Sequence, residues 1–318
     1  MRDVPEVQVV CATYRRAHLL ARLVAALEAQ DFPLDRVEVC IVDDGSSDGT
    51  VDELHRLAGA SPLRLTALCL DHNVGAARAR NQGWRSGTAP LVAFVDDDCV
   101  PEPGWLRAGV EALRADPRRG VVQGAVHRPP DAVLQPWSVF REHHEATPFF
   151  EGCNVFYRRD ALDEGGGFSE AIGWYGEDTE AAWSVLDRGW GRGFAGAAIV
   201  VHDVEDRGVL WHVRNGYLER NLIGVGARHP GFASEAYWRR HVWKPHVAAV
   251  SLAGLALVLC LVAWTWFPVV LTVPWLWLRW PRRGYRSHPL LGPQRFVVDG
   301  AQAVGHLAGS LRHGTLVL

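Results

Sequence analysis

Short apolar runs alternate with amphipathic stretches over the first hundred residues of the chain. Runs rich in Val, Leu and Ile predict strands at 7–12, 37–42, 63–70 and 91–95, and helical patterns lie between them at about 16–29, 48–58 and 75–86. Continuous apolar strands that alternate with helices are typical of a mostly parallel sheet covered on both faces. The sequence therefore predicts an α/β fold with a doubly wound, mostly parallel sheet.

The pattern is less regular from 104 to 230. It predicts strands at 120–126, 152–157 and 194–201, and helices at 104–115, 177–188, 208–228 and 234–243. We expect residues 1–125 and 126–230 to form two halves of one α/β domain. Residues 231–318 then form a separate set of C-terminal helices.

A long apolar segment occupies the C-terminal part, with no charged residue between 247 and 278. This exceeds the roughly 20 residues that cross a bilayer, but Thr265 and Pro268 divide it. Basic residues stand on both sides, which favours placing both ends in the cytosol; they are Arg239, Arg240, Lys244, Arg279, Arg282, Arg283 and Arg286. We therefore predict a short hydrophobic helical hairpin at 247–280 that spans, re-enters or lies on a membrane, the alternative being a pair of buried core helices.

Two neighbouring features bear on the same prediction. Five tryptophans suit the headgroup level of a membrane, and they are Trp264, Trp266, Trp275, Trp277 and Trp280. Residues 294–312 are expected to form an amphipathic surface helix.

Composition excludes several classes of protein. The chain has 33 basic and 36 acidic residues, a net charge of -3, so nucleic acid is not an expected partner. Its six cysteines form no CxxC pair, which argues against a zinc ribbon or a thioredoxin-type site. Reduced cysteines in apolar runs favour a cytosolic compartment.

Acidic residues follow the predicted strands. Asp43 and Asp44 end the second strand, and Asp96, Asp97 and Asp98 end the fourth. In parallel sheets, ligands bind beyond the carboxyl ends of the strands. Three adjacent carboxylates repel one another, and Mg²⁺ or Mn²⁺ would relieve that repulsion. The alternatives are an ordinary turn with a helix cap for the first pair and a solvated acidic loop for the triplet.

Other candidates stand at helix starts and strand ends. Arg80 lies in the first turns of the helix at 75–86, where a guanidinium could pair with phosphate. Trp174 and Tyr175 precede Glu177 and Asp178, so a carboxylate base could stand beside aromatic surfaces suited to sugars, although acidic residues are also ordinary in a first helical turn. His202 ends a strand and is either a metal ligand or a structural residue.

Six sequence pieces, in this order, resemble family 2 glycosyltransferases of the GT-A fold. They are VVCATYRR at 9–16, VDDGSSDGT at 42–50, NVG at 73–75 with ARNQG at 79–83, FVDDD at 94–98, GCN at 152–154 and GED at 176–178. The resemblance covers roughly residues 5–205. It implies a nucleotide-diphospho-sugar donor, a divalent metal (Mg²⁺ or Mn²⁺) and inversion at the anomeric carbon.

The resemblance also implies roles for individual residues. Asp178 would be the catalytic base, and Asp98, Asp96 and His202 would hold the metal. Donor-nucleotide contacts would come from Ala12, Thr13, Tyr14, Asp43, Asp44, Arg80, Asp96 and Asp97. Asn154, Trp174, Tyr175 and Glu177 would border the sugar and the acceptor.

Together these features predict a metal-dependent glycosyltransferase on the cytoplasmic membrane, with its catalytic domain facing the cytosol. The acceptor would be a lipid-linked or cell-envelope glycan. The alternative is a degenerate glycosyltransferase that binds nucleotide or glycan as a membrane module. A nicotinamide dehydrogenase is disfavoured because the first strand lacks GxGxxG.

Overall fold

The computed structural model describes residues 4–172, 174–237, 241–263, 267–279 and 291–318. The chain forms two compact units. The first contains the residues up to Ala132 together with Phe140–Val204, and the second contains Val133–Val139 together with Glu205–Leu318. These boundaries differ from the expected ones at 125 and 230.

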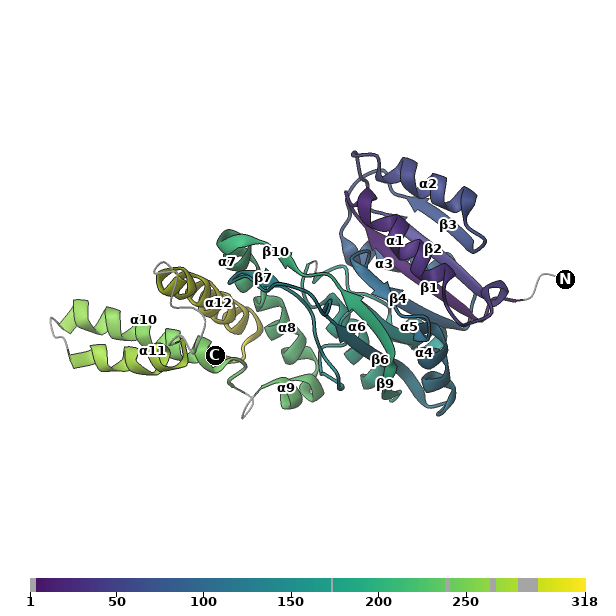
Figure 1. The fold of residues 1–318 in the computed structure, drawn as a ribbon. Helices are drawn as coiled ribbons and strands as arrows, with labels where there is room; N and C mark the ends of the chain where they lie inside the picture. The colour runs from purple at the N-terminus through teal and green to yellow at the C-terminus, as the bar shows by residue number, and fades with distance from the viewer. Residues whose placement is uncertain (1–3, 173, 238–240, 264–266, 280–290) are drawn as a thin grey trace. The chain divides into compact units, whose positions relative to one another are not determined.

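An eight-stranded sheet forms the centre of the first unit, in the order β3-β2-β1-β4-β8-β6-β9-β5 (Figure 1). The strands are β1 (Val7–Thr13), β2 (Val37–Asp43), β3 (Arg64–Cys69), β4 (Leu91–Val95), β5 (Cys99–Pro101), β6 (Arg119–His127), β8 (Asn154–Arg158) and β9 (Gly191–His202). The first four are parallel, and β8 is antiparallel to both β4 and β6. The predicted mostly parallel α/β sheet is confirmed, with antiparallel pairs confined to its second half.

Helices cover both faces of this sheet. Side chains of α1 (Ala17–Glu28), α2 (Thr50–Ala60) and α4 (Trp105–Arg114) share one buried core with Val7, Val9 and Cys11 of β1. Helix α3 (Ala76–Arg85) packs on the other face, beside α5 (Arg159–Gly165) and α6 (Glu177–Asp187). A short 3-10 turn, η1 (Leu34–Arg36), leads into β2.

Two glycines fix how the chain approaches the sheet edge. A Cβ on Gly83 of α3 would lie 2.6 Å from Val10 and 2.9 Å from Val42, so the helix sits directly on the strands. Gly45, just after β2, has φ +73°, and a Cβ there would lie 2.4 Å from the backbone of His72. Glycine is the residue that tolerates such a conformation and approach.

The second unit is mainly helical. It contains α7 (Gly208–Leu218), α8 (Arg220–Arg228), α9 (Pro230–Ala236), α10 (Pro245–Ala263), η2 (Phe267–Thr272), α11 (Val273–Arg279) and α12 (Leu291–His313), with a two-stranded ribbon of β7 (Ser138–Val139) and β10 (Glu205–Asp206). The helix expected at 208–228 is divided at Glu219. The helix expected at 234–243 is instead α9, which begins at Pro230 because proline suits a first helical turn.

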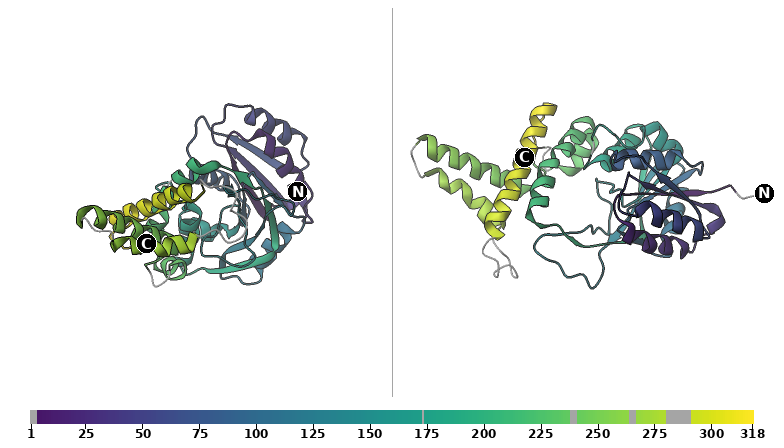
Figure 2. Two further views of the ribbon diagram at one scale, coloured as in Figure 1. Left: turned by 60° about the vertical axis from the view of Figure 1, so that its left-hand side comes forward. Right: turned by 90° about the horizontal axis from the view of Figure 1, so that it is seen from above.

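The predicted C-terminal hairpin is present, because α10 packs against η2 and α11. Helices α10 and α11 run side by side (Figures 1 and 2). Within the described residues, one helix is long and apolar enough to cross a membrane; its window Pro245–Val262 has a mean hydropathy of 2.2. Core helices of soluble proteins meet the same criterion. Of the five tryptophans, Trp275 is buried and Trp277 is exposed, whereas Trp264, Trp266 and Trp280 lie outside the described residues.

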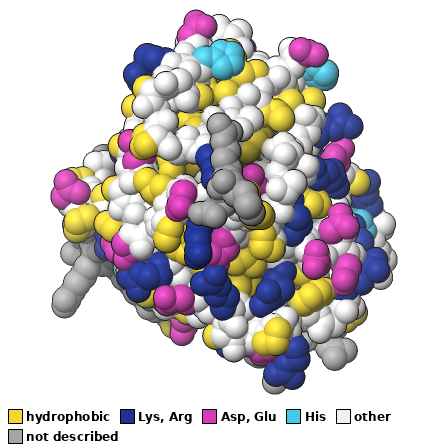
Figure 3. Space-filling model, turned by 90° about the vertical axis from the view of Figure 1, so that its right-hand side faces the viewer, with side chains coloured by type: hydrophobic (Ala, Val, Ile, Leu, Met, Phe, Trp, Pro, Cys, Tyr) yellow, Lys and Arg dark blue, Asp and Glu magenta, His cyan; other side chains and the backbone are white. Residues whose placement is uncertain are grey.

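The expected C-terminal amphipathic helix is α12, which packs against α7 and α8. On the face of the molecule shown in Figure 3, basic and acidic side chains interleave. No extended patch of one sign covers that face.

Candidate active site

The acidic strand ends gather at one edge of the sheet, as expected for parallel strands. Thr13 at the end of β1 is paired in register with Asp43 at the end of β2. Asp96, Asp97 and Asp98 form the turn from β4 to β5, closed by the amide of Cys99 donating to the carbonyl of Asp96 at 3.2 Å. The triplet therefore lies where the chain leaves the parallel strands and crosses to the far edge strand.

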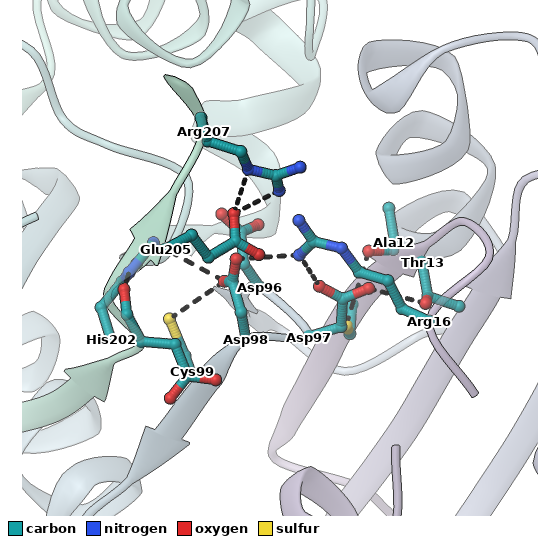
Figure 4. A network of polar contacts seen from close by, with 12 residues as sticks. Ala12, Thr13, Arg16, Asp96, Asp97, Asp98, Cys99, His202, Glu205 and Arg207 are labelled. Carbon is teal, nitrogen blue, oxygen red and sulfur yellow. Dashed lines mark hydrogen bonds and ion pairs between the residues drawn. The ribbon is translucent and has the colours of Figure 1, made fainter. Parts of the chain in front are cut away.

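Asp97 faces the first strand and is held there (Figure 4). Its carboxylate accepts hydrogen bonds from the Thr13 hydroxyl at 2.7 Å and from an Nη of Arg16 at 2.7 Å. Burial raises the pKa of Asp97 to about 6, although Arg16 opposes the shift. Thr13 and Asp97 were both predicted as donor-binding residues, and the structure brings them together.

Asp98 and His202 lie on the other side of the same turn (Figure 4). The Nε2 atom of His202 is 3.6 Å from Asp98 Oδ1, and ligand atoms of Asp98, Cys99 and His202 lie within 4.8 Å of one another. The Nδ1 atom of His202 lies 2.7 Å from the carbonyl of Asp203, to which an N–H there would donate. That tautomer leaves a lone pair on Nε2, the arrangement that metal-binding histidines use.

Neighbouring residues hold His202 in this position. The amide of Asp203 donates to the carbonyl of Asp98 at 3.0 Å. The guanidinium of Arg22, from α1, donates to both oxygens of the Asp203 carboxylate. The acidic turn and helix α1 thus both hold Asp203, the residue that follows the candidate metal ligand.

Arg80 is buried and bridges two acidic elements. Its guanidinium donates to Asp96 Oδ1 at 2.8 Å and to Glu177 Oε1 at 2.9 Å. Burial opposes the charge on Asp96, but Arg80 outweighs it and lowers the pKa of Asp96. Arg80 and Asp96 thus form one ion-pair network with Glu177, so Arg80 links the acidic turn to the start of α6.

Asp178 follows Glu177 at the start of α6 and has a different environment. Its Oδ2 accepts from the amide of Gly152 at 2.9 Å and its Oδ1 from the amide of Thr179 at 2.7 Å. In the described chain, no lysine, arginine or histidine forms an ion pair with it. Burial, together with the charge of Glu177, raises the pKa of Asp178 to about 7. A carboxylate with a pKa near neutrality can act as a general base at physiological pH.

The carboxylates of Asp43 and Asp44 have different hydrogen-bond partners. Asp44 caps a turn, since its two oxygens accept from the amides of Val74 at 2.7 Å and Gly75 at 3.0 Å. Asp43 is fully buried; its Oδ2 accepts from the Ser46 amide, whereas its Oδ1 has no hydrogen-bond partner in the described chain. Buried polar atoms are almost always satisfied, so Asp43 is the better candidate of the two for contacting a base.

Of the predicted aromatic residues, Trp174 and Tyr14 are exposed and Tyr175 is half-buried. Trp174 is 59% exposed and Tyr14 is 38% exposed, and Ala12 at the end of β1 is half-buried. Tyr175 adopts φ 79°, a left-handed conformation that a bulky residue rarely takes. Such backbone strain is common at functional sites.

Asn154 has a different environment from the expected one. It is fully buried, its Oδ1 accepts from Trp105 at 2.8 Å, and its Nδ2 donates to the carbonyls of Ala125 and Ala198. All of these partners belong to the sheet or to α4. Asn154 therefore ties β8 to its neighbours, and we do not propose it as a sugar contact.

Two further residues of the site were missed by the sequence analysis. Arg16 pairs with Asp98 at 2.8 Å as well as with Asp97, and Gly152 supplies the amide bonded to Asp178. Both lie inside recognised motif segments, but their partners are 81, 82 and 26 residues away. Only the folded sheet brings them together.

A mixed sheet with acidic strand ends, and a helix that begins with an acidic pair, is the architecture of GT-A glycosyltransferases. Comparison with protein families matches residues 8–168, about half of the chain, to glycosyl transferase family 2. The chain belongs to this family.

Similar proteins agree with this membership. The mannosyltransferase PcManGT from Pyrobaculum calidifontis, solved in complex with GDP-Man and Mn²⁺, is 26% identical, with a TM-score of 0.70 over 95% of this chain and 87% of that chain. Glycosyltransferase AglE of Haloferax volcanii is 34% identical over 35% of this chain and 36% of its own length. The pre-mycofactocin glycosyltransferase of Mycobacterium tuberculosis is 28% identical over 71% of this chain and 48% of its own length. The chain therefore matches about half or less of the length of these two relatives.

Proposed function

We propose that the protein is an inverting glycosyltransferase that moves a sugar from a nucleotide-diphospho-sugar to an acceptor hydroxyl. The observation that carries this proposal is Asp178, a partly buried carboxylate at the start of α6 with a pKa of about 7. Its neighbour Glu177 is joined through Arg80 to the acidic turn. The GDP-Man and Mn²⁺ bound by PcManGT support a nucleotide-sugar donor and a divalent metal.

In the proposed reaction, Asp178 takes the proton from the acceptor hydroxyl as the oxygen attacks the anomeric carbon. A new bond forms between that oxygen and the anomeric carbon on the face opposite the diphosphate. The bond between the anomeric carbon and the diphosphate oxygen breaks, and its electron pair leaves with the nucleoside diphosphate. The unpaired oxygen of Asp43 and the Thr13–Asp97 pair are suited to hold the base and ribose.

The donor set around Asp98 fits a hard divalent cation. Asp98 offers a carboxylate oxygen and His202 an imidazole nitrogen, whereas the Cys99 sulfur suits softer metals. We propose that Asp98 and His202 hold Mg²⁺ or Mn²⁺. The predicted ligand Asp96 belongs to the same turn and forms an ion pair with Arg80. When bound, the ion would stabilise negative charge on the departing diphosphate.

Thermal unfolding with nucleotides tests the donor proposal. The purified chain is heated with UDP, GDP, dTDP or CDP, each with and without Mn²⁺. Because a ligand that binds only the folded state raises the melting temperature, we expect one diphosphate to stabilise the protein only with metal. If a folded sample responds to none of them, the degenerate binding module becomes the better explanation.

The C-terminal hairpin supports a membrane setting. Its exposed side chains are apolar and include Leu255, Val258, Leu261 and Val262 on α10 and Trp277 on α11. We propose that the hairpin enters a membrane on its cytosolic side and that the acceptor is lipid-linked or part of the cell envelope. Flotation with liposomes tests this, since Leu255→Glu with Val258→Glu should abolish co-flotation while leaving nucleotide binding intact.

A further inference from the structure

A second charged cluster lies beside Asp178, in the irregular segment between β6 and β8. Two basic residues contact the Glu151 carboxylate: Arg141 Nε lies 3.2 Å from Oε1, and His143 Nδ1 lies 3.0 Å from Oε2. The next residue is Gly152, whose amide holds Asp178. The cluster is therefore joined directly to the backbone that positions the proposed base.

Both ring nitrogens of His143 are engaged. Nδ1 lies 3.0 Å from Oε2 of Glu151, and Nε2 lies 3.0 Å from the carbonyl of Gly124. Because a carbonyl can only accept, Nε2 donates to it. His143 therefore fixes one carboxylate oxygen of Glu151, while the other oxygen contacts Arg141.

Arg141 has guanidinium N–H groups that no described residue accepts. In the part of the chain that the structure describes, its only hydrogen bond or ion pair is the contact of Nε with Glu151, and its side chain is 41% exposed. Burial opposes its charge, but Glu151, Tyr175 and Asp178 raise the pKa of Arg141. Arg141 is therefore linked to the proposed base through Glu151 and the adjacent Gly152, whose amide binds Asp178.

We propose that Arg141 binds an oxyanion on the acceptor, a phosphate or carboxylate carried close to the hydroxyl that Asp178 deprotonates. This inference rests on the proposed glycosyl transfer. It adds that the acceptor of that reaction carries a negative charge. A planar guanidinium with two free N–H groups matches either oxyanion with two parallel hydrogen bonds. Arg141 is then a specificity-determining residue, and His143 is a positioning residue that acts through Glu151.

Calorimetric titration of inorganic phosphate tests this site in the full chain. The protein is first saturated with Mn²⁺ and with the nucleoside diphosphate that stabilises it most, so that the donor side is filled. We expect phosphate to bind the wild type, and Arg141→Gln to weaken that binding by roughly tenfold to hundredfold. Arg141→Lys should retain part of the affinity, because it keeps the charge and loses the two-pronged geometry.

Arg128→Gln is the matched control. Arg128 lies nearby and pairs with Glu142 at 3.2 Å, so its loss should leave phosphate binding unchanged. Acetate in place of phosphate separates the two oxyanions, and binding of either one that depends on Arg141 supports the proposal. Equal phosphate and acetate binding by wild type and Arg141→Gln, or no binding of either, would overturn it.

The donor supplies an independent readout. If Arg141→Gln weakens the nucleoside diphosphate as strongly as phosphate, Arg141 contacts the donor and the acceptor assignment is wrong. If no nucleoside diphosphate binds the wild type, the proposed function fails by itself. The phosphate titration then still reports on Arg141 in the nucleotide-free protein, and its dependence on Arg141 decides whether an anion site exists.

Discussion

Asp178 in the first unit is a partly buried carboxylate and Glu219 in the second is a buried one, and their hydrogen-bond partners differ. Glu219 Oε1 accepts from Lys244 at 2.6 Å and from Gln302 at 2.9 Å, and its Oε2 is 3.2 Å from His306. Among the residues that the structure describes, the hydrogen-bond donors to Asp178 are uncharged: the amides of Gly152 and Thr179 and the Thr179 hydroxyl. Burial opposes ionisation of both, yet the pKa of Glu219 is lowered, chiefly by His306 and Lys244, whereas the pKa of Asp178 is raised.

This difference separates a carboxylate that stabilises the fold from one that could act as a general base. Glu219 ends α7, and its partners come from α12 and from the residue before α10, so it ties the base of the hairpin to the rest of the second unit. Its charge is fully compensated, and it has no remaining capacity to exchange a proton near neutral pH. Asp178 lacks such compensation, and strongly perturbed groups of this kind mark functional sites.

The largest effect is expected from Asp178→Asn. An amide of the same shape keeps the helix start but cannot take a proton, so transfer should fall by about 10³-fold or more. Nucleoside diphosphate binding with Mn²⁺ should stay within about twofold of the wild type, because the proposed partner of Asp178 is the acceptor and not the nucleotide. Radiolabelled sugar transfer and thermal shift measure the two quantities.

Asp187→Asn, at the exposed end of the same helix, controls for a general effect on α6. It should transfer sugar at the wild-type rate. Transfer by Asp178→Asn at a rate equal to this control would remove Asp178 from the mechanism.

Glu219→Gln should act on stability instead. Removing the carboxylate charge leaves the Lys244 ammonium without its partner, so we expect a loss of about 3 kcal/mol in the free energy of unfolding measured with urea. The exposed Glu235→Gln should change it by less than about 0.5 kcal/mol. A Glu219→Gln protein as stable as Glu235→Gln would mean that Glu219 contributes no structural charge pair.

Sequence patterns were informative where the structure depends on local order. Strands β1 to β4, β6, β8 and β9, the acidic ends at Asp43 and Asp96, and the start of α6 were predicted, because hydrophobic periodicity and turn chemistry act over a few residues. The short edge strand β5, the division of the long helix at Glu219 and the pairing of Arg16 with Asp97 were not. Each depends on contacts between residues far apart in sequence, such as the 87 residues between Glu219 and His306.

Asp98→Ala should have a smaller and more selective effect than Asp178→Asn. It removes an oxygen ligand of the proposed metal site, so the Kd of the nucleoside diphosphate in Mn²⁺ should rise roughly tenfold to hundredfold. Without Mn²⁺ the variant and the wild type should bind alike, and the exposed Asp52→Ala should match the wild type in both conditions. Unchanged affinity in Mn²⁺ would place the metal elsewhere.

The smallest effect, and the one that sharpens the comparison most, is the dependence of transfer on pH. Asp178 acts only when it is deprotonated, and its pKa is about 7. The rate at saturating substrate should therefore rise up to about tenfold per pH unit below 7 and level off above it. Asp187→Asn should show the same profile. Glu219, whose lowered pKa keeps it ionised throughout this range, contributes stability that falls only as acid pH approaches its folded-state pKa. A rate that stays flat from pH 5.5 to pH 8 while the protein remains folded would show that no group with the pKa of Asp178 limits the reaction.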